Sequence, residues 1–395
     1  MARKLPHAKE GLMQALIILM AEKPFPLIKI TEICQVSGYN RGTFYNHYQH
    51  KDELLEDLLE IKLQELNTVL EDIAKNHSRM QRIELLIPLF SYIYDNRYFF
   101  SVILGEHKIA GFRLRLFEIY RKYIAQHIVK PLPSVENDPL LKTFQLDFVS
   151  STWLGISLFW IHQQEHPSPE YVTEQFIKIM EIPVHKIFTK DWRFKFRKEN
   201  AAVDVKVRGA KKAFQIALIK QLMIKEYKMI RIQDILEISG YNRSSFYLNF
   251  ADKEDLFHSL RDGLTTGMIQ AFRNGPQNAR AVIGRDLPIA TVFDYLYENR
   301  ELLKLMYSSK AVPGFFDYMF NAMSDFFVEE LSGRVNVDKN IYSNYLATTL
   351  MTIIGAWFTH GVRYSPEFIV GFYLDILHQS STSFKEKYIN NRVLI

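Results

Sequence analysis

The sequence predicts an all-α protein made of two copies of one helical unit. Apolar residues recur at spacings of three and four along most of the chain, as at Leu54, Leu55 and Leu58, and this is the period of an amphipathic helix. Alternating strand patterns are absent from the sequence. The stretch SGYNRGTFY at residues 37–45 returns as SGYNRSSFY at residues 239–247. A repeat of half the chain length indicates a duplication, so we expect both halves to act in the same way.

The repeat continues outside this stretch. Residues 28–30 (IKI) return as residues 230–232 (IRI), and Trp160 with a following Ser-Pro-Glu returns as Trp357 with the same triplet. Each Ser-Pro pair predicts the start of a helix, because serine accepts hydrogen bonds from free amides and proline loses no useful donor there. The second copy is a few residues shorter before its tryptophan, and we expect the loss in the proline-bearing loop 131–139.

Composition narrows the class of protein. The chain has 395 residues, 48% of them hydrophobic, and a formal net charge of +5, which permits a polyanionic partner without requiring one. The single cysteine, Cys34, excludes an internal disulfide and fits a reducing, cytoplasmic location, where we expect a core thiol rather than a redox sensor. Residues 1–20 imitate a signal peptide, but Gln14 interrupts the apolar run and the same pattern returns in mid-chain, so we expect a first helix and no membrane partner.

No cofactor, metal or catalytic activity is expected. The histidines do not form a spaced ligand set. The sequence also lacks a glycine-rich phosphate loop, a catalytic triad and a paired-carboxylate motif with usable context, so an enzyme is not predicted.

Residues 30–48 have the spacing of a helix, a turn and a second helix. Gly38 allows the chain to turn with positive φ, and Asn40 is suited to cap the second helix. In that helix Phe44 and Tyr48 lie four residues apart and are expected to face inward. The outer side then carries arginine, hydroxyl, asparagine and tyrosine side chains, which suits a helix that enters the major groove of DNA.

Together with the following Lys51-Asp52-Glu53-Leu54 and Lys253-Glu254-Asp255-Leu256, these motifs resemble the TetR/AcrR family of transcriptional repressors. The resemblance is specific over about the first sixty residues of each half and extends to the rest only as a layout of helices. It implies a helical regulatory domain in each half, a dimer interface made by the last two helices, and often a pocket for a small-molecule inducer. The partners it implies are a double-stranded DNA operator and an inducer of unknown identity.

We expect the DNA-binding residues to occupy matching positions in the two heads. In the first they are Lys29, Arg41, Gly42, Thr43, Tyr45, Asn46, His47 and Lys51, and in the second Arg231, Arg243, Ser244, Ser245, Tyr247, Leu248, Asn249 and Lys253.

The role of each DNA-binding position follows from its residue type or from the family pattern. The tyrosines and the lysines of Lys-x-x-Leu resemble the family's phosphate contacts, and the arginines suit either guanine or the backbone. Asn46 would prefer adenine where Leu248 would touch a thymine methyl, so the two half-sites should differ.

Lys29 and Arg231 stand where many family members have a capping threonine. A cation at a helix N-terminus is disfavoured by the helix dipole, which points to a compensating anion such as a DNA phosphate. The alternative is that both are solvated side chains beside a buried Ile28 and Ile30. The surrounding charge differs between the heads, with 7 Lys/Arg against 8 Asp/Glu in residues 1–60 and 11 against 7 in residues 205–262, so the second head should hold phosphate more strongly.

These observations predict the following organisation. Residues 1–60 and 206–262 are helix-turn-helix heads, residues 61–189 and 263–395 are helical regulatory domains, and residues 190–205 are a basic linker. We expect the two halves to pair within the chain as a pseudo-dimer and to repress transcription from an imperfect palindrome. Two alternatives stay open: further dimerisation giving four heads, and a coactivator or interaction module of the same fold that has lost DNA binding.

Overall fold

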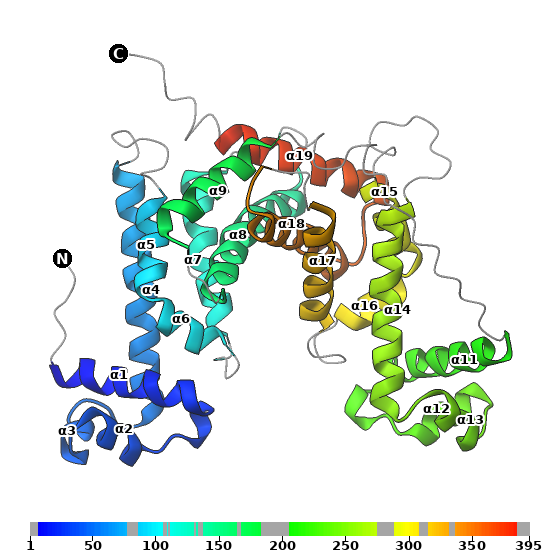
Figure 1. Ribbon diagram of the computed structural model, residues 1–395, viewed down its shortest axis with the longest axis horizontal. Helices are drawn as coiled ribbons and strands as arrows, with labels where there is room; N and C mark the ends of the chain where they lie inside the picture. The colour runs from blue at the N-terminus through cyan, green and yellow to red at the C-terminus, as the bar shows by residue number, and fades with distance from the viewer. Residues whose placement is uncertain are drawn as a thin grey trace. The chain divides into compact units, whose positions relative to one another are not determined.

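The computed structural model describes residues 7–76, 86–105, 109, 111–129, 132, 137–163, 167–182, 205–274, 288–307, 315–331 and 336–384 (Figure 1). Every regular element in these ranges is a helix, which confirms the predicted fold class. The chain divides into two compact units. One holds residues 1–181, 336–345 and 379–395, and the other holds residues 182–335 and 346–378.

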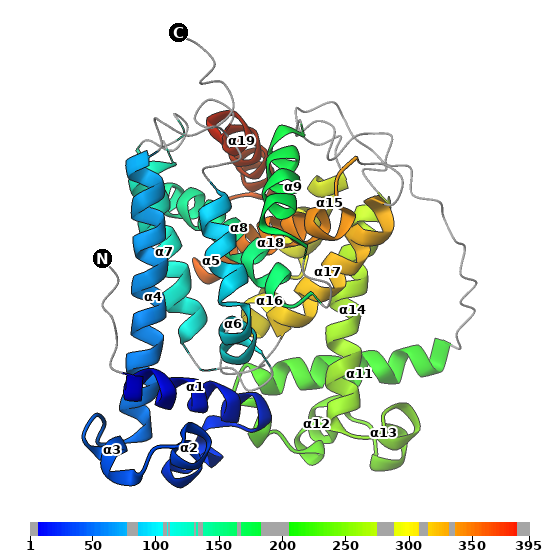
Figure 2. The ribbon, with the colours of Figure 1, turned by 60° about the vertical axis from the view of Figure 1, so that its left-hand side comes forward.

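The first head is built from four helices and one 3-10 turn. These are α1 (His7–Glu22), η1 (Phe25–Leu27), α2 (Ile30–Ser37), α3 (Arg41–Tyr45) and the start of the long α4 (Lys51–Asn76). Figures 1 and 2 both show α1, α2 and α3 gathered at one end of α4. Their apolar faces meet in a core whose centre is fully buried, and it contains Leu12, Leu16, Ile33, Phe44 and Leu54.

The regulatory region of the first unit consists of α5 (Ile87–Asp95), α6 (Arg97–Leu104), α7 (Phe112–His127), α8 (Pro139–Ile161) and α9 (Pro169–Glu181). Helix α8 packs on α7, α9 packs on α5, and α4 contacts both α5 and α7. The Trp160 indole donates a hydrogen bond to the Pro167 carbonyl (3.1 Å) and so fixes the loop before α9. Tyr94 stacks on the same ring at 5.7 Å between centroids.

The second copy repeats these elements. Its head comprises α11 (Val205–Leu222), η3 (Tyr227–Met229), α12 (Ile232–Ser239), α13 (Arg243–Asn249) and the start of α14 (Lys253–Asn274). The helices that follow are α15 (Pro288–Glu298), α16 (Arg300–Tyr307), α17 (Phe315–Leu331), α18 (Lys339–Thr359) and α19 (Pro366–Phe384). The Trp357 indole donates to the Tyr364 carbonyl (3.1 Å) and Tyr297 stacks on its ring, so the duplication extends to individual contacts.

Each head shares its last helix with the regulatory region, since α4 runs past residue 60 and α14 past residue 262. The predicted domain boundaries stay predictions, and linker residues 190–204 lie outside the described ranges. The structure does correct the place of the shortened segment. Trp160 stands 22 residues after Asp138, the cap of α8, whereas Trp357 stands 19 after Asp338, the cap of α18. Three of the missing residues therefore belong to the helix and not to the loop before it.

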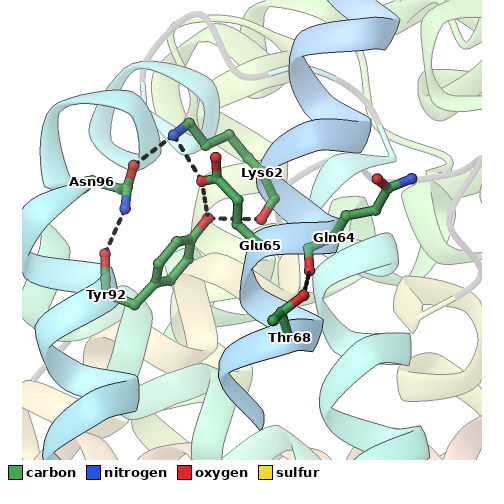
Figure 3. Close-up of polar contacts among 6 residues, drawn as sticks. All are labelled: Lys62, Gln64, Glu65, Thr68, Tyr92 and Asn96. Carbon is green, nitrogen blue, oxygen red and sulfur yellow. Dashed lines mark hydrogen bonds and ion pairs between the residues drawn. The ribbon is translucent and has the colours of Figure 1, made fainter. Parts of the chain in front are cut away.

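A polar cluster ties α4 to the regulatory region of the first unit (Figure 3). The Lys62 ammonium donates to Asn96 Oδ1 (2.8 Å) and pairs with Glu65 (2.9 Å), while the Tyr92 hydroxyl donates to the Lys62 carbonyl (2.7 Å). On the opposite side, Arg115 of α7 reaches two glutamates of α4 at 2.7 and 2.8 Å. Helix α4 is thus held on two sides along the length that connects head and regulatory region.

Candidate nucleic-acid interface

The turn between the two helices of the motif depends on a glycine in each head. Gly38 ends α2 with φ +74°, and Gly240 ends α12 with φ +73°. This left-handed conformation is strained for residues that carry a Cβ. The predicted turn is confirmed in both copies.

An asparagine starts each second helix. Asn40 Oδ1 accepts a hydrogen bond from the Thr43 amide at 2.8 Å, and Asn242 Oδ1 accepts from the Ser245 amide at the same distance. Each side chain satisfies an amide that the first turn of a helix would otherwise leave free. The predicted caps are confirmed.

The second helix of the first head turns an aromatic face inward. Phe44 and Tyr48 are buried, while Arg41, Gly42, Tyr45 and Asn46 are exposed and Thr43 and His47 are half-buried. Helix α3 covers only five residues, so Tyr48 lies beyond its end, held by a bond from its amide to the Phe44 carbonyl (2.9 Å). The exposed side chains share one face, as the sequence predicts.

The second head presents a different outer face. Phe246 and Phe250 are buried, Ser245 is half-buried, and Arg243, Ser244, Tyr247 and Leu248 are exposed, with Leu248 at 85% of its full area. The Arg243 guanidinium lies over the Tyr247 ring at 5.8 Å. Asn249 is turned back toward its helix. Its amide nitrogen donates to the Ser245 carbonyl (2.7 Å), and its Oδ1 is buried without a hydrogen-bond partner. This side chain must rotate before it can reach a base.

The anion that offsets Lys29 and Arg231 lies within the chain. Glu32, three residues into α2, accepts from the Lys29 amide (2.8 Å) and pairs with Lys23 (2.6 Å). Asp234 does the same with the Arg231 amide and Lys225, both at 2.7 Å. In each head the lysine and then the backbone donor lower the pKa of the carboxyl. An external phosphate is not needed at these helix starts, so the predicted DNA contact of Lys29 and Arg231 depends only on their exposed positions.

The lysine that begins α4 holds the segment that leads into α2. The Lys51 ammonium donates to the carbonyls of Phe25 (2.9 Å), Pro26 (2.9 Å) and Ile28 (2.8 Å), which uses all three of its protons. Lys253 donates in the same way to Tyr227 (3.1 Å) and Ile230 (3.0 Å). In this arrangement, a phosphate bound at the start of α4 would be met by backbone amides and the positive end of the helix dipole rather than by the Lys51 ammonium.

The two heads differ most in a cluster beside the second helix. In the first head Lys9 pairs with Asp57 (2.9 Å), and the Tyr48 hydroxyl donates to the same carboxylate (2.8 Å). Burial raises the pKa of Asp57, but hydrogen bonds from Lys9 and Tyr48 outweigh it, so the net pKa is lowered. In the second head Lys211 replaces Lys9, Phe250 replaces Tyr48 and Ser259 replaces Asp57.

Lys211 therefore has no carboxylate at the position that Asp57 occupies in the first head. It lies instead over the Phe250 ring at 5.7 Å. Lys9 and Lys211 are not among the site residues predicted from the sequence. A comparison of the repeats at positions 57 and 259 would have found the difference.

The remaining candidates are a reactive thiol, a metal site and a membrane span. Cys34 is buried, and burial raises the pKa of its thiol, as fits a core residue. Within the described ranges, no group of histidine, cysteine and carboxylate side chains could hold a metal ion. None of the helices described is both long enough and apolar enough to span a bilayer.

Two helix-turn-helix heads, each continuous with its own helical regulatory region, define a transcriptional regulator with a duplicated architecture. Both regulatory regions, residues 82–182 and 288–379, match the TetR family model described as "Transcriptional regulator C-terminal region". The chain is also similar to the "Uncharacterized HTH-type transcriptional regulator YxbF" of Bacillus subtilis (strain 168). The identity is 22% over 385 residues, which are 94% of this chain and 97% of that protein. The chain is thus a TetR-type transcriptional regulator that contains the family's C-terminal region twice.

Proposed function

We propose that this regulator is a sequence-specific repressor that reads an imperfect palindrome with the two recognition helices of one chain, α3 and α13. The duplicated head is the observation that carries the proposal. Both copies have the same glycine turn and asparagine cap, and both expose an arginine, a tyrosine and small polar groups on one face. Such a face combines phosphate-binding and base-reading side chains on a helix that fits the major groove.

Differences between the two outer faces support unlike half-sites. Asn46 in the first head offers a donor and an acceptor, which suit adenine, whereas the strongly exposed Leu248 offers only apolar contact. Gly42 is likewise replaced by Ser244. The operator should therefore have an adenine preference in one half-site and a thymine preference at the matching position of the other.

The two halves supply both heads from one chain if they pair as a pseudo-dimer. Paired heads of this kind present recognition helices roughly 34 to 36 Å apart on DNA. The linker of about fifteen residues spans up to roughly 50 Å when extended, so it permits this pairing. Tethering also raises the effective concentration of each half near the other. Repression and release by a small molecule remain part of the proposal on the strength of the family resemblance.

Selection of bound fragments from genomic DNA with the full-length chain tests the proposal. The expected product is an imperfect palindrome bound by one chain per site, with affinity that falls as salt rises because phosphates are neutralised. Exchanging the two half-sites should weaken binding, since each head prefers its own sequence. Binding without enrichment of any sequence, or no salt-dependent binding at all, would contradict the proposal and favour an interaction module. Two chains on one operator would contradict the pairing within the chain.

A further inference from the structure

The start of α18 is attached to α9 by a polar contact. Residues 336–345 belong to the first unit together with residues 1–181, although the rest of α18 does not. The Asp338 amide donates to Gln175 Oε1 (2.8 Å), and the Tyr171 hydroxyl donates to Asp338 Oδ2 (3.1 Å). The other carboxylate oxygen of Asp338 caps α18 by accepting from the Asn340 and Ile341 amides at 2.9 and 3.1 Å. One aspartate thus both starts α18 and binds α9.

The contact is specific because it satisfies a buried group. Gln175 is only 6% exposed, so water could not replace the Asp338 amide as a hydrogen-bond donor to its side-chain oxygen. A buried acceptor without a partner is destabilising, so separation of α9 from α18 is disfavoured. Burial and then the nearby carboxylate raise the pKa of Tyr171, so it remains a neutral donor to Asp338 at neutral pH.

The equivalent surface of the second half cannot make this contact. The Tyr171 amide lies 3.2 Å from the Ser168 hydroxyl and the Phe368 amide 3.3 Å from the Ser365 hydroxyl, which aligns α9 with α19. In that alignment, Phe368 replaces Tyr171 and Phe372 replaces Gln175. Their rings stack on each other at 6.4 Å and offer no hydrogen-bonding group.

Self-pairing of the first half is disfavoured for a different reason. Asp138 caps α8 as Asp338 caps α18, but it lies three residues farther from its tryptophan. Three residues correspond to about 4.5 Å along a helix. Asp138 of another first half is therefore displaced by nearly one turn from the place where Asp338 meets Gln175.

We propose that this one-sided contact, Tyr171 and Gln175 of α9 with Asp338 of α18, selects pairing between the unlike halves of the same chain. The proposal rests on the pairing proposed above and names the residues that choose the partner. Two second halves lack the hydrogen-bonding groups of Tyr171 and Gln175 on the last helix. Two first halves have those groups but lack an aspartate in the position of Asp338. The tether then favours the partner within the chain over one from another chain.

Cross-linking tests the contact without DNA, in a Cys34→Ser background that removes the single native thiol. Glu174 and Lys339 are exposed neighbours of Gln175 and Asp338, so replacing them with cysteine leaves the contact intact. Glu174→Cys and Lys339→Cys should be joined by a bis-maleimide, giving chains of monomer mass with a linked peptide between positions 174 and 339. The single variant Glu174→Cys is the control for links between chains. Covalent chain dimers, or no link in protein with unchanged helical circular dichroism, would overturn the proposal.

Partner choice is measured with the Tyr171→Phe/Gln175→Leu variant. In sedimentation runs over a range of concentrations, the parent chain should stay a compact monomer, whereas the variant should gain a species of two chains. The surface substitution Gln64→Leu on α4 is the control. An unchanged monomer in the double variant would show that the contact does not select the partner. Intact cross-linking without operator binding would contradict only the proposed function, and operator binding without the cross-link would contradict only this inference.

Discussion

The cluster of Lys9, Tyr48 and Asp57 gives a direct test of the charge difference between the heads. The double substitution Tyr48→Phe/Asp57→Ser converts this cluster into its counterpart in the second head, where phenylalanine and serine accompany Lys211. It removes the carboxylate that Lys9 pairs with at 2.9 Å. The phenylalanine avoids leaving a tyrosine hydroxyl without its acceptor, so packing should be preserved.

The expected change in the salt dependence of DNA affinity follows from the release of one cation, Lys9. If the released Lys9 neutralises one further phosphate, the plot of log affinity against log salt steepens by about 0.9. A fourfold rise in salt then weakens the variant by about 3.5-fold more than the parent chain. The lost ion pair is partly exposed, with side chains at 27% and 33%, so folding stability should fall by no more than about 1 kcal/mol.

Titration of the full chain onto operator DNA at several salt concentrations measures the slope. Asp72→Ser is the matched control, because it removes one negative charge from the part of α4 remote from the head, where Asp72 pairs loosely with Lys75 at 3.6 Å. The control should leave the slope unchanged. An equal change in both variants would refute the local argument and show that only net charge matters. An unchanged slope in both variants would show that Lys9 does not contact DNA.

Three further predictions follow from the same heads. Arg41→Ala should weaken binding to one half-site and Arg243→Ala to the other, each by about 1–3 kcal/mol if the contact is to guanine, measured on operators with one half-site altered; equal losses on random DNA would mark phosphate contacts instead. Asn40→Ala and Asn242→Ala should each destabilise their head by about 1 kcal/mol in thermal unfolding, while serine at either position should restore the cap. Because the pKa of Asp57 is lowered in the folded chain, its contribution to stability is present above about pH 4 and lost as pH falls through the folded pKa. Tyr48→Phe/Asp57→Ser should therefore lose less stability on acidification than the parent chain, and an equal loss in both would contradict this.

The sequence predicts the parts of the site that depend on local chain geometry. Gly38 and Asn40 stand in the spacing that a turn and a cap require, and Phe44 lies on the inner face by helical periodicity alone. Glu32 was also open to prediction, since an acidic residue three positions after the cap commonly accepts from the cap amide. Its partner Lys23 could not be inferred, because it lies in the loop before α2.

The role of Lys51 shows the limit of such predictions. Its ammonium binds carbonyls 23 to 26 residues earlier in the chain. No local period or motif encodes which backbone oxygens a flexible side chain will meet after folding. Family resemblance suggests a phosphate contact for the same position, whereas the structure uses the side chain within the head. The pairing of Asp338 with α9 is likewise a contact between distant segments, which the repeat alone does not reveal.

The hydrogen bonds of the Lys51 ammonium make α4 and the segment before α2 one rigid unit. They fasten the first turn of α4 to the loop that leads into α2, so a tilt of α4 must carry α2 and its attached recognition helix along as one block. We expect motion of the regulatory region to move α3 along with α4, because little of it can be absorbed at this connection. Lys253 makes two such hydrogen bonds where Lys51 makes three, so we expect a looser connection between α14 and the rest of the second head.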